Sequence, residues 1–146
     1  MNCPIDRRLP SSLLPWIGLG LSVLGLAGFG CGGGSHQQYV PAESRAREAV
    51  EATLNAWKSA QPEGDARTIS EGVKVNGLDQ DWRSGKVLSD FTILEALAAV
   101  EHEPRQFRVR LNYAGETNPV ETVYFVVGID PLWVFREEDY RRTGGG

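Results

Sequence analysis

The apolar and polar residues of this chain follow two periods, one typical of a helix and one typical of strands. Over residues 41–60 small or apolar side chains recur every three or four positions, as on the buried stripe of an amphipathic helix. These residues are Ala46, Ala49, Val50, Thr53, Leu54 and Trp57. Pro41 suits the first turn of such a helix, and the proline and glycine of residues 61–64 suit its end. The pattern predicts a helix over residues 41–60 with Trp57 in the core.

From Lys86 onward the period changes to two, which is typical of strands. Alternation begins at Val87, and it is strictest over residues 107–113, where apolar and polar positions predict opposite faces of one strand. The apolar positions are Phe107, Val109, Leu111 and Tyr113, and the polar ones are Arg108, Arg110 and Asn112. Residues 120–129 are apolar on both sides, so we expect a central strand covered on both faces. Residues 132–135 predict a short last strand, whereas residues 94–100 fit either a strand or a helical turn.

The segments between these elements carry turn signals. Val73 and Val75 suggest a short strand, and the Asn76-Gly77 dipeptide predicts a turn. We expect residues 79–85 to form a polar loop whose Trp82 packs on the sheet, and residues 114–119 to connect a hairpin. Residues 137–139 are acidic and predict a solvated tail.

One helix followed by strands and short hairpins predicts an α+β fold, with one long helix packed on a three- to four-stranded antiparallel sheet. In its order of elements, the segment from Pro41 to Arg136 resembles the cystatin-like and nuclear-transport-factor-like group of folds. Enzymes of that group use an acid/base pair in a cone-shaped pocket. With a single long helix, the resemblance implies no such pocket walls here, and we identify no catalytic constellation.

The N-terminal segment has the features of a targeting signal. Arg7 and Arg8 precede an apolar run over residues 13–30, small residues end it, and Cys31 follows. These are the parts of an export signal. The segment resembles the signal peptide of a bacterial lipoprotein, which implies that Cys31 receives lipid and that the chain is cut before it. The DWRSG segment and the GCGGG junction look like those of uncharacterised planctomycete lipoproteins.

Two other interpretations of this segment stay open. Its 18 residues are long enough for an uncut membrane anchor in the form of an apolar helix. Ordinary secretion is the second. The lipoprotein interpretation divides the chain into a signal at 1–30, a lipidated cysteine with a glycine-rich tether at 31–40, a domain at 41–142 and a tail at 143–146.

Charge and cysteine content argue against some classes of partner and against an internal disulfide. From Gly32 onward 13 Lys and Arg face 18 Asp and Glu, a net charge of −5, which argues against nucleic acid as a partner. Apart from Cys31, the one cysteine is Cys3 in the segment expected to be removed, so we expect no intramolecular disulfide. Nothing in the sequence indicates a metal or another cofactor.

We therefore expect a membrane-anchored envelope lipoprotein, held by acyl chains such as palmitate on Cys31, with a non-catalytic domain that binds a protein partner or a second copy of itself. The candidate interaction face comprises Arg108, Arg110 and Tyr124. The alternatives are a small-molecule carrier that uses the groove between helix and sheet, and a small enzyme. Cross-strand ion pairs of the arginines with Glu121 are the simpler role for these charges.

The anchor gives the first testable prediction. Cys31→Ala should leave the precursor uncut and without acyl mass, because the thiol that accepts the lipid is gone. Intact mass of membrane-extracted protein measures both effects, and Cys3→Ala is the matched control. A lipid-free, full-length wild-type protein in the native host would refute the anchor.

Overall fold

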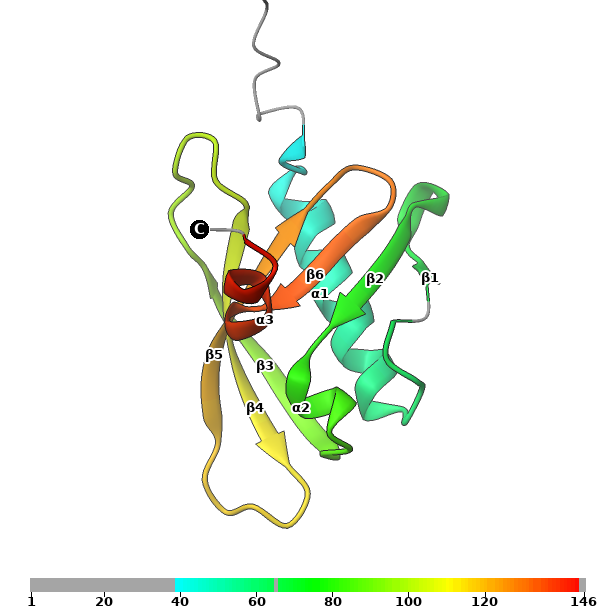
Figure 1. Ribbon diagram of the computed structural model, residues 1–146, viewed down its shortest axis with the longest axis vertical. Coiled ribbons are helices and arrows are strands. Elements are labelled where there is room, and N and C mark those ends of the chain that lie inside the picture. The colour runs from blue at the N-terminus through cyan, green and yellow to red at the C-terminus, as the bar shows by residue number, and fades with distance from the viewer. Residues whose placement is uncertain (1–38, 65, 145–146) are drawn as a thin grey trace, which may run out of the picture. The chain divides into compact units, whose positions relative to one another are not determined.

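The computed structural model describes residues 39–64 and 66–144, and it shows an α+β domain built on a curled, mixed sheet of six strands (Figure 1). The sheet order is β1-β2-β6-β5-β4-β3. The strands are β1 Arg67–Thr68, β2 Lys74–Leu78, β3 Leu88–Ala96, β4 Arg105–Tyr113, β5 Val120–Val127 and β6 Leu132–Arg136. The helices are α1 Glu43–Lys58, α2 Gln80–Arg83 and α3 Glu137–Arg142, with a 3-10 turn at Ser70–Gly72.

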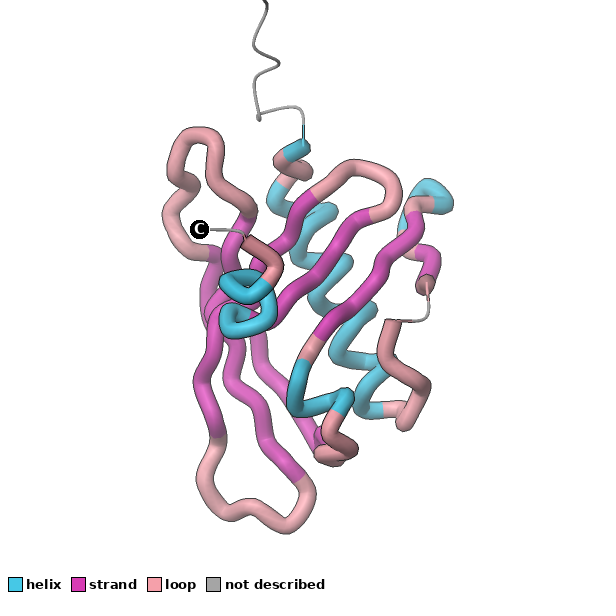
Figure 2. Tube along the Cα trace, viewed as in Figure 1, coloured by secondary structure: helices cyan, strands magenta, loops and turns pink. Residues whose placement is uncertain are grey.

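Helix α1 packs on one face of the sheet, which we call the inner face, and the short helix α3 lies on the other, the outer face (Figure 2). The predicted helical stripe is confirmed, because Ala46, Val50 and Leu54 are fully buried and Trp57 nearly so. Strand β4 alternates as predicted, with Phe107, Val109 and Leu111 fully buried beneath α1. Burial of these side chains is the main stabilising term of the domain.

The prediction of a three- to four-stranded antiparallel sheet is wrong in strand number and in direction. Strand β2 pairs in parallel with β6, with Val75 opposite Leu132 and Leu78 opposite Phe135. The remaining pairs are antiparallel. Parallel neighbours require a long connection. Here α2 and the strands β3, β4 and β5 form the connection between β2 and β6.

The predicted turn at Asn76-Gly77 is also wrong, since both residues lie inside β2. A Cβ atom added at Gly77 would lie 2.3 Å from Cγ2 of Thr53 on α1. Gly77 is therefore a point of close approach between helix and sheet, which is the other common reason for a glycine in a strand.

Three further segments differ from their predictions. Residues 137–139 are not a solvated tail but start α3, and Asp139 is buried. Residues 94–100 continue β3 to Ala96 and then leave regular structure, so the strand alternative is correct for only the first part. The expectation that residues 120–129 are covered on both faces is also wrong: strand β5 is buried on its inner face at Thr122, Tyr124 and Val126, whereas its outer face is half-buried and, at Glu121, exposed.

The aromatic residues close one end of the core. Trp82 stacks on Trp57 with ring centroids 5.8 Å apart, and Tyr113 lies at the same distance from Trp57 in a tilted arrangement. Both indole nitrogens donate to backbone carbonyls, Trp57 to Lys86 at 2.8 Å and Trp82 to Gln61 at 3.0 Å. Trp82 is buried as expected, but the ring on which it stacks, Trp57, belongs to α1 and not to the sheet.

The contact at Gly77 can be tested by a double-mutant cycle. Gly77→Ala should lower the free energy of unfolding by roughly 1–3 kcal/mol through overpacking. Thr53→Ala removes the clashing methyl group, and the Thr53 hydroxyl has no hydrogen-bond partner among the described residues. The double variant should regain most of the loss in urea denaturation. Additive effects of the two substitutions would contradict this contact.

Candidate functional site

The predicted interaction face is only partly assembled by the structure. Arg108 and Arg110 lie exposed on the outer face, where Arg108 pairs with Glu95 at 2.9 Å and Arg110 with Glu121 at 2.8 Å. Both ion pairs join neighbouring strands; the pair with Glu121 is as predicted, whereas Glu95 was not a predicted partner. Tyr124 is opposite Phe107 in the β4–β5 register and is fully buried. The prediction that Tyr124 shares the face of the arginines is therefore wrong, because it points toward α1.

Tyr124 belongs instead to a buried polar cluster beside α2, which comprises Asp79, Asp81, Tyr113, Tyr124 and Arg136. Asp79 precedes α2 and caps it, accepting from the backbone amides of Asp81 at 2.8 Å and Trp82 at 3.2 Å. Its second carboxylate oxygen accepts the Tyr124 hydroxyl at 2.6 Å. One side chain thus fixes the start of a helix and ties it to β5.

Asp81 forms the other half of the polar cluster. It accepts hydrogen bonds from the Tyr113 hydroxyl at 2.8 Å and from the Arg136 guanidinium. Arg136 is almost buried and also lies 3.7 Å from an Asp79 oxygen. Asp139 of α3 accepts from the Gln80 backbone amide at 2.8 Å. Strands β4, β5 and β6 and both short helices therefore meet through charged or polar contacts.

The electrostatics of the polar cluster follow from burial and from these partners. Burial raises the pKa of Asp79, although the Tyr124 hydroxyl and Arg136 oppose the rise. Burial also acts to raise the pKa of Asp81, but hydrogen bonds from Arg136 and Tyr113 outweigh it and lower that pKa. For Arg136 burial favours the neutral form, yet the two aspartates raise its pKa overall. Asp81 and Arg136 are thus a charged pair. The negative charge of Asp79 costs more free energy to bury than that of Asp81.

The polar cluster contains residue types that occur in acid/base sites, but its Asp79–Tyr124 pair is not accessible to a substrate. Asp79 is 1% exposed and Tyr124 is 0% exposed, so a substrate cannot reach the proton that they share. The carboxylates of Asp79 and Asp81 and the hydroxyls of Tyr113 and Tyr124 already bond one another, Arg136 or the backbone of α2. The arrangement therefore serves to hold α2 against the sheet. An aspartate followed by a short polar run and a tryptophan was the available sequence signal, and it indicates an N-cap.

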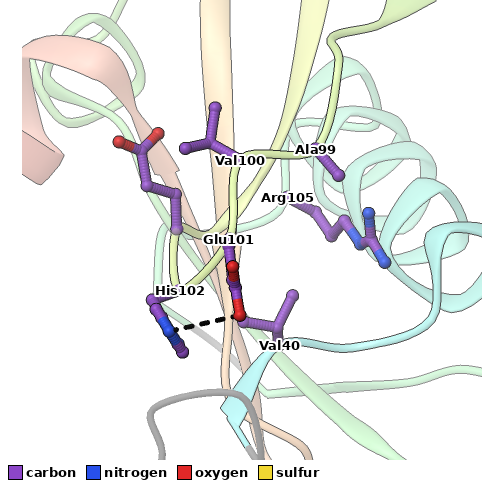
Figure 3. A pocket seen from close by; sticks show the side chains of 7 residues that line it. Val40, Ala99, Val100, Glu101, His102 and Arg105 are labelled. Atoms are coloured by element: carbon purple, nitrogen blue, oxygen red, sulfur yellow. Dashed lines mark ion pairs between the residues drawn. The ribbon is translucent and has the colours of Figure 1, made fainter.

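The opposite end of the sheet is open. A hollow of about 310 Å³ lies between the β3–β4 connection and Val40, and Figure 3 shows its lining side chains. The lining residues are Val40, Ala99, Val100, Glu101, His102, Glu103 and Arg105. Glu101 and His102 form an exposed ion pair at 3.5 Å. Arg105 donates to the Pro41 carbonyl at 3.1 Å, which secures the start of α1 against the sheet.

Aromatic side chains gather on the outer face at β5, β6 and α3. Phe125 stacks on Tyr140 of α3 with ring centroids 4.5 Å apart, and Phe135 lies 5.9 Å from the same ring. Trp133 continues this row, 6.2 Å from Phe135, and is 37% exposed. Sequence reasoning missed this row because α3 was not expected.

The structure describes no metal centre. Within residues 39–64 and 66–144 no three His, Cys, Asp or Glu side chains are grouped so that they could hold a metal ion. Over the same ranges no helix combines the length and apolar character needed to cross a membrane. Cys31, the predicted lipidation site, lies outside the described residues.

Comparison with known proteins gave no match: no family model, no curated protein and no solved structure is detectably similar to this chain.

The polar cluster predicts a pH dependence at alkaline pH. Burial raises the pKa values of Tyr113 and Tyr124 above the ordinary value of about 10, and Asp81 and Asp79 add to the rise. Above pH 10 the unfolded chain loses these protons while the folded domain keeps them. The free energy of unfolding should then fall, by up to about 1.4 kcal/mol per pH unit for each tyrosine.

Urea denaturation at several pH values between 9 and 11 measures this slope. The Tyr113→Phe/Tyr124→Phe variant should be less stable overall but should show a shallower slope, because the two groups no longer titrate. Tyr39→Phe, at an exposed position, is the matched control. An unchanged slope in the double variant would mean that these hydroxyls are not protected from ionisation.

Proposed function

We propose that this protein is a membrane-anchored lipoprotein of the cell envelope whose domain is a non-catalytic interaction module. It would bind a protein partner or a second copy of itself through the outer face of β3, β4 and β5. The lipid on Cys31 would hold the domain outside the cytoplasm. No nucleic acid is expected as a partner, since acidic residues outnumber basic ones.

The observation that carries this proposal is the contrast between the two faces of the sheet. The inner face is covered by α1 and contributes most of the fully buried side chains. On the outer face, α3 contacts β5 and β6, whereas Arg108, Arg110 and Thr92 on β4 and β3 are exposed. The arginines of β4 and the aromatic row of β5, β6 and α3 lie on the same face of the sheet, and both residue types are enriched at protein interfaces.

The ion pairs on this face suit a surface that is solvated in the free protein. Arg108 and Glu95 are each about half exposed, at 47% and 52%, so their attraction is screened by water. Such pairs contribute roughly 0–1 kcal/mol to folding. Their charges can therefore be redirected to a partner at little cost to the domain.

The carrier alternative has less support. A ligand in the groove between α1 and the sheet would have to displace Leu54, Phe107 or Tyr124, each of which is fully buried. The enzyme alternative has least support, because Asp79 and Tyr124, which share a proton, are 1% and 0% exposed. Both remain separate outcomes of the experiment below, through co-purified small molecules or turnover.

The outer face is tested by removing its two arginines. Arg108→Ser/Arg110→Ser should leave the free energy of unfolding within about 1 kcal/mol of wild type. It should weaken self-association in analytical ultracentrifugation, or the recovery of a partner co-purified with wild type, by tenfold or more. Arg45→Ser/Arg83→Ser is the matched control, because it also removes two ion-paired arginines outside this face.

Two results would refute the interface. If the double variant unfolds, the arginines are structural. If it matches wild type and the control in every sizing and co-purification experiment, the outer face is only a solvated surface.

A further inference from the structure

The end of the sheet where the described chain begins exposes apolar side chains from three separate segments. Tyr39 is 58% exposed, Val100 in the β3–β4 connection is 54% exposed, and Ile129 in the β5–β6 connection is 44% exposed. Ala98 and Ala99 next to Val100 are exposed as well. Apolar groups exposed together at one end of a domain indicate a surface that meets another phase or molecule.

These three segments are neighbours in space. The Gly128 amide donates to the Tyr39 carbonyl at 2.8 Å, which places Tyr39 beside the turn that carries Ile129. Val40 lines the hollow of Figure 3 together with Ala99 and Val100, and a second hollow together with Tyr39 and His102. Figure 1 shows both connections at the end of the sheet where α1 starts. We call Tyr39, Ala98, Ala99, Val100 and Ile129 the apolar tip.

The apolar tip is held in a defined shape. The Leu97 amide donates to the Gln106 carbonyl at 2.9 Å, and the Glu103 amide donates to the Val100 carbonyl at 3.1 Å. These bonds close the connection around Val100, whose side chain is 54% exposed. Little ordering would therefore be needed when the apolar tip contacts a partner.

The position of the predicted anchor indicates that this partner is the membrane. Seven residues, GGGSHQQ, separate Cys31 from Tyr39. A chain of this glycine-rich composition has an end-to-end distance of roughly 15 Å. If Cys31 carries lipid, Tyr39 is the point of the domain that is held nearest to the bilayer. The short connection also gives the apolar tip a high effective concentration at the lipid surface.

We propose that the apolar tip rests in the headgroup region of the membrane and fixes the orientation of the anchored domain. This inference rests on the proposed lipidation of Cys31. Tyrosine is a side chain that favours the membrane–water interface. Glu101, Glu103 and Asp130 flank the apolar tip, so the surface that it fits is zwitterionic rather than anionic lipid. In this orientation the outer face of β3, β4 and β5 stays clear of the bilayer.

The test uses the lipidated protein, purified from membranes and reconstituted into phosphatidylcholine vesicles that contain brominated phosphatidylcholine. A single cysteine is introduced by Val100→Cys or Ile129→Cys and labelled with a small fluorophore. Because the Cys31 sulfur is occupied by lipid, the label reaches only the new thiol. Thr117→Cys is the matched control, exposed in the β4–β5 connection at the opposite end of the sheet.

Bromine should quench the fluorophores at positions 100 and 129 at least threefold more than the fluorophore at position 117. Adding Ile129→Glu to the Val100→Cys protein should abolish that difference while the protein still sediments with the vesicles. Replacing part of the phosphatidylcholine by phosphatidylglycerol should reduce the quenching at position 100.

Equal quenching at the three positions, or none at any, in protein that sediments with the vesicles would overturn the docking but leave the anchor intact. Disulfide cross-linking between copies of unlabelled Val100→Cys would assign the apolar tip to a second copy and also overturn it. Stronger quenching on phosphatidylglycerol would overturn the choice of a zwitterionic surface. Protein without acyl mass that stays in the supernatant would overturn the proposed anchor and, with it, this inference.

Discussion

The buried carboxylate of Asp79 is the constraint on which the end of the sheet next to α2 depends. A carboxylate that is 1% exposed is stable only if hydrogen bonds replace its water. Asp79 obtains them from the amides of α2 and from the Tyr124 hydroxyl, with Arg136 close by. Removing one of these partners would leave the buried charge less well compensated, which costs more than the contact contributes. The short helix α2, which could not persist alone, is stabilised in this way.

This constraint also divides the molecule into regions with different roles. The α2 end is closed by charged and aromatic contacts, and the inner face is closed by α1. Among the described residues, exposed surface with interaction chemistry includes the outer face of β3, β4 and β5 and the apolar tip at the other end of the sheet. The proposed functions of these two surfaces are compatible, because one meets a protein and the other meets lipid.

Sequence periodicity was sufficient for the elements whose partners are local. Helix α1, strand β4 and the β4–β5 hairpin follow from repeats within a few residues, and the buried faces of α1 and β4 are as expected, whereas that of β5 is not. The ion pair between Arg110 and Glu121 was also predictable, since a short hairpin sets its own register. Periodicity could not reveal that β2 pairs with β6, because their residues are more than 50 positions apart and share no local signal.

Tyr124 and Gly77 show which features the sequence determined and which only the tertiary structure decided. The sequence by itself predicted a strand over residues 120–129, which the structure shows over Val120–Val127, but with apolar residues on both sides it placed Tyr124 on the wrong face. Pairing with Phe107 across β4 decided the orientation of Tyr124, and Asp79 then satisfied the hydroxyl. Likewise, the sequence marked Gly77 as a special backbone position, but only the approach of Thr53 decided that the cause is close packing and not a turn. Local repeats determine which elements form; the cost of burying unpaired polar groups, and the space between packed elements, decide where each side chain goes.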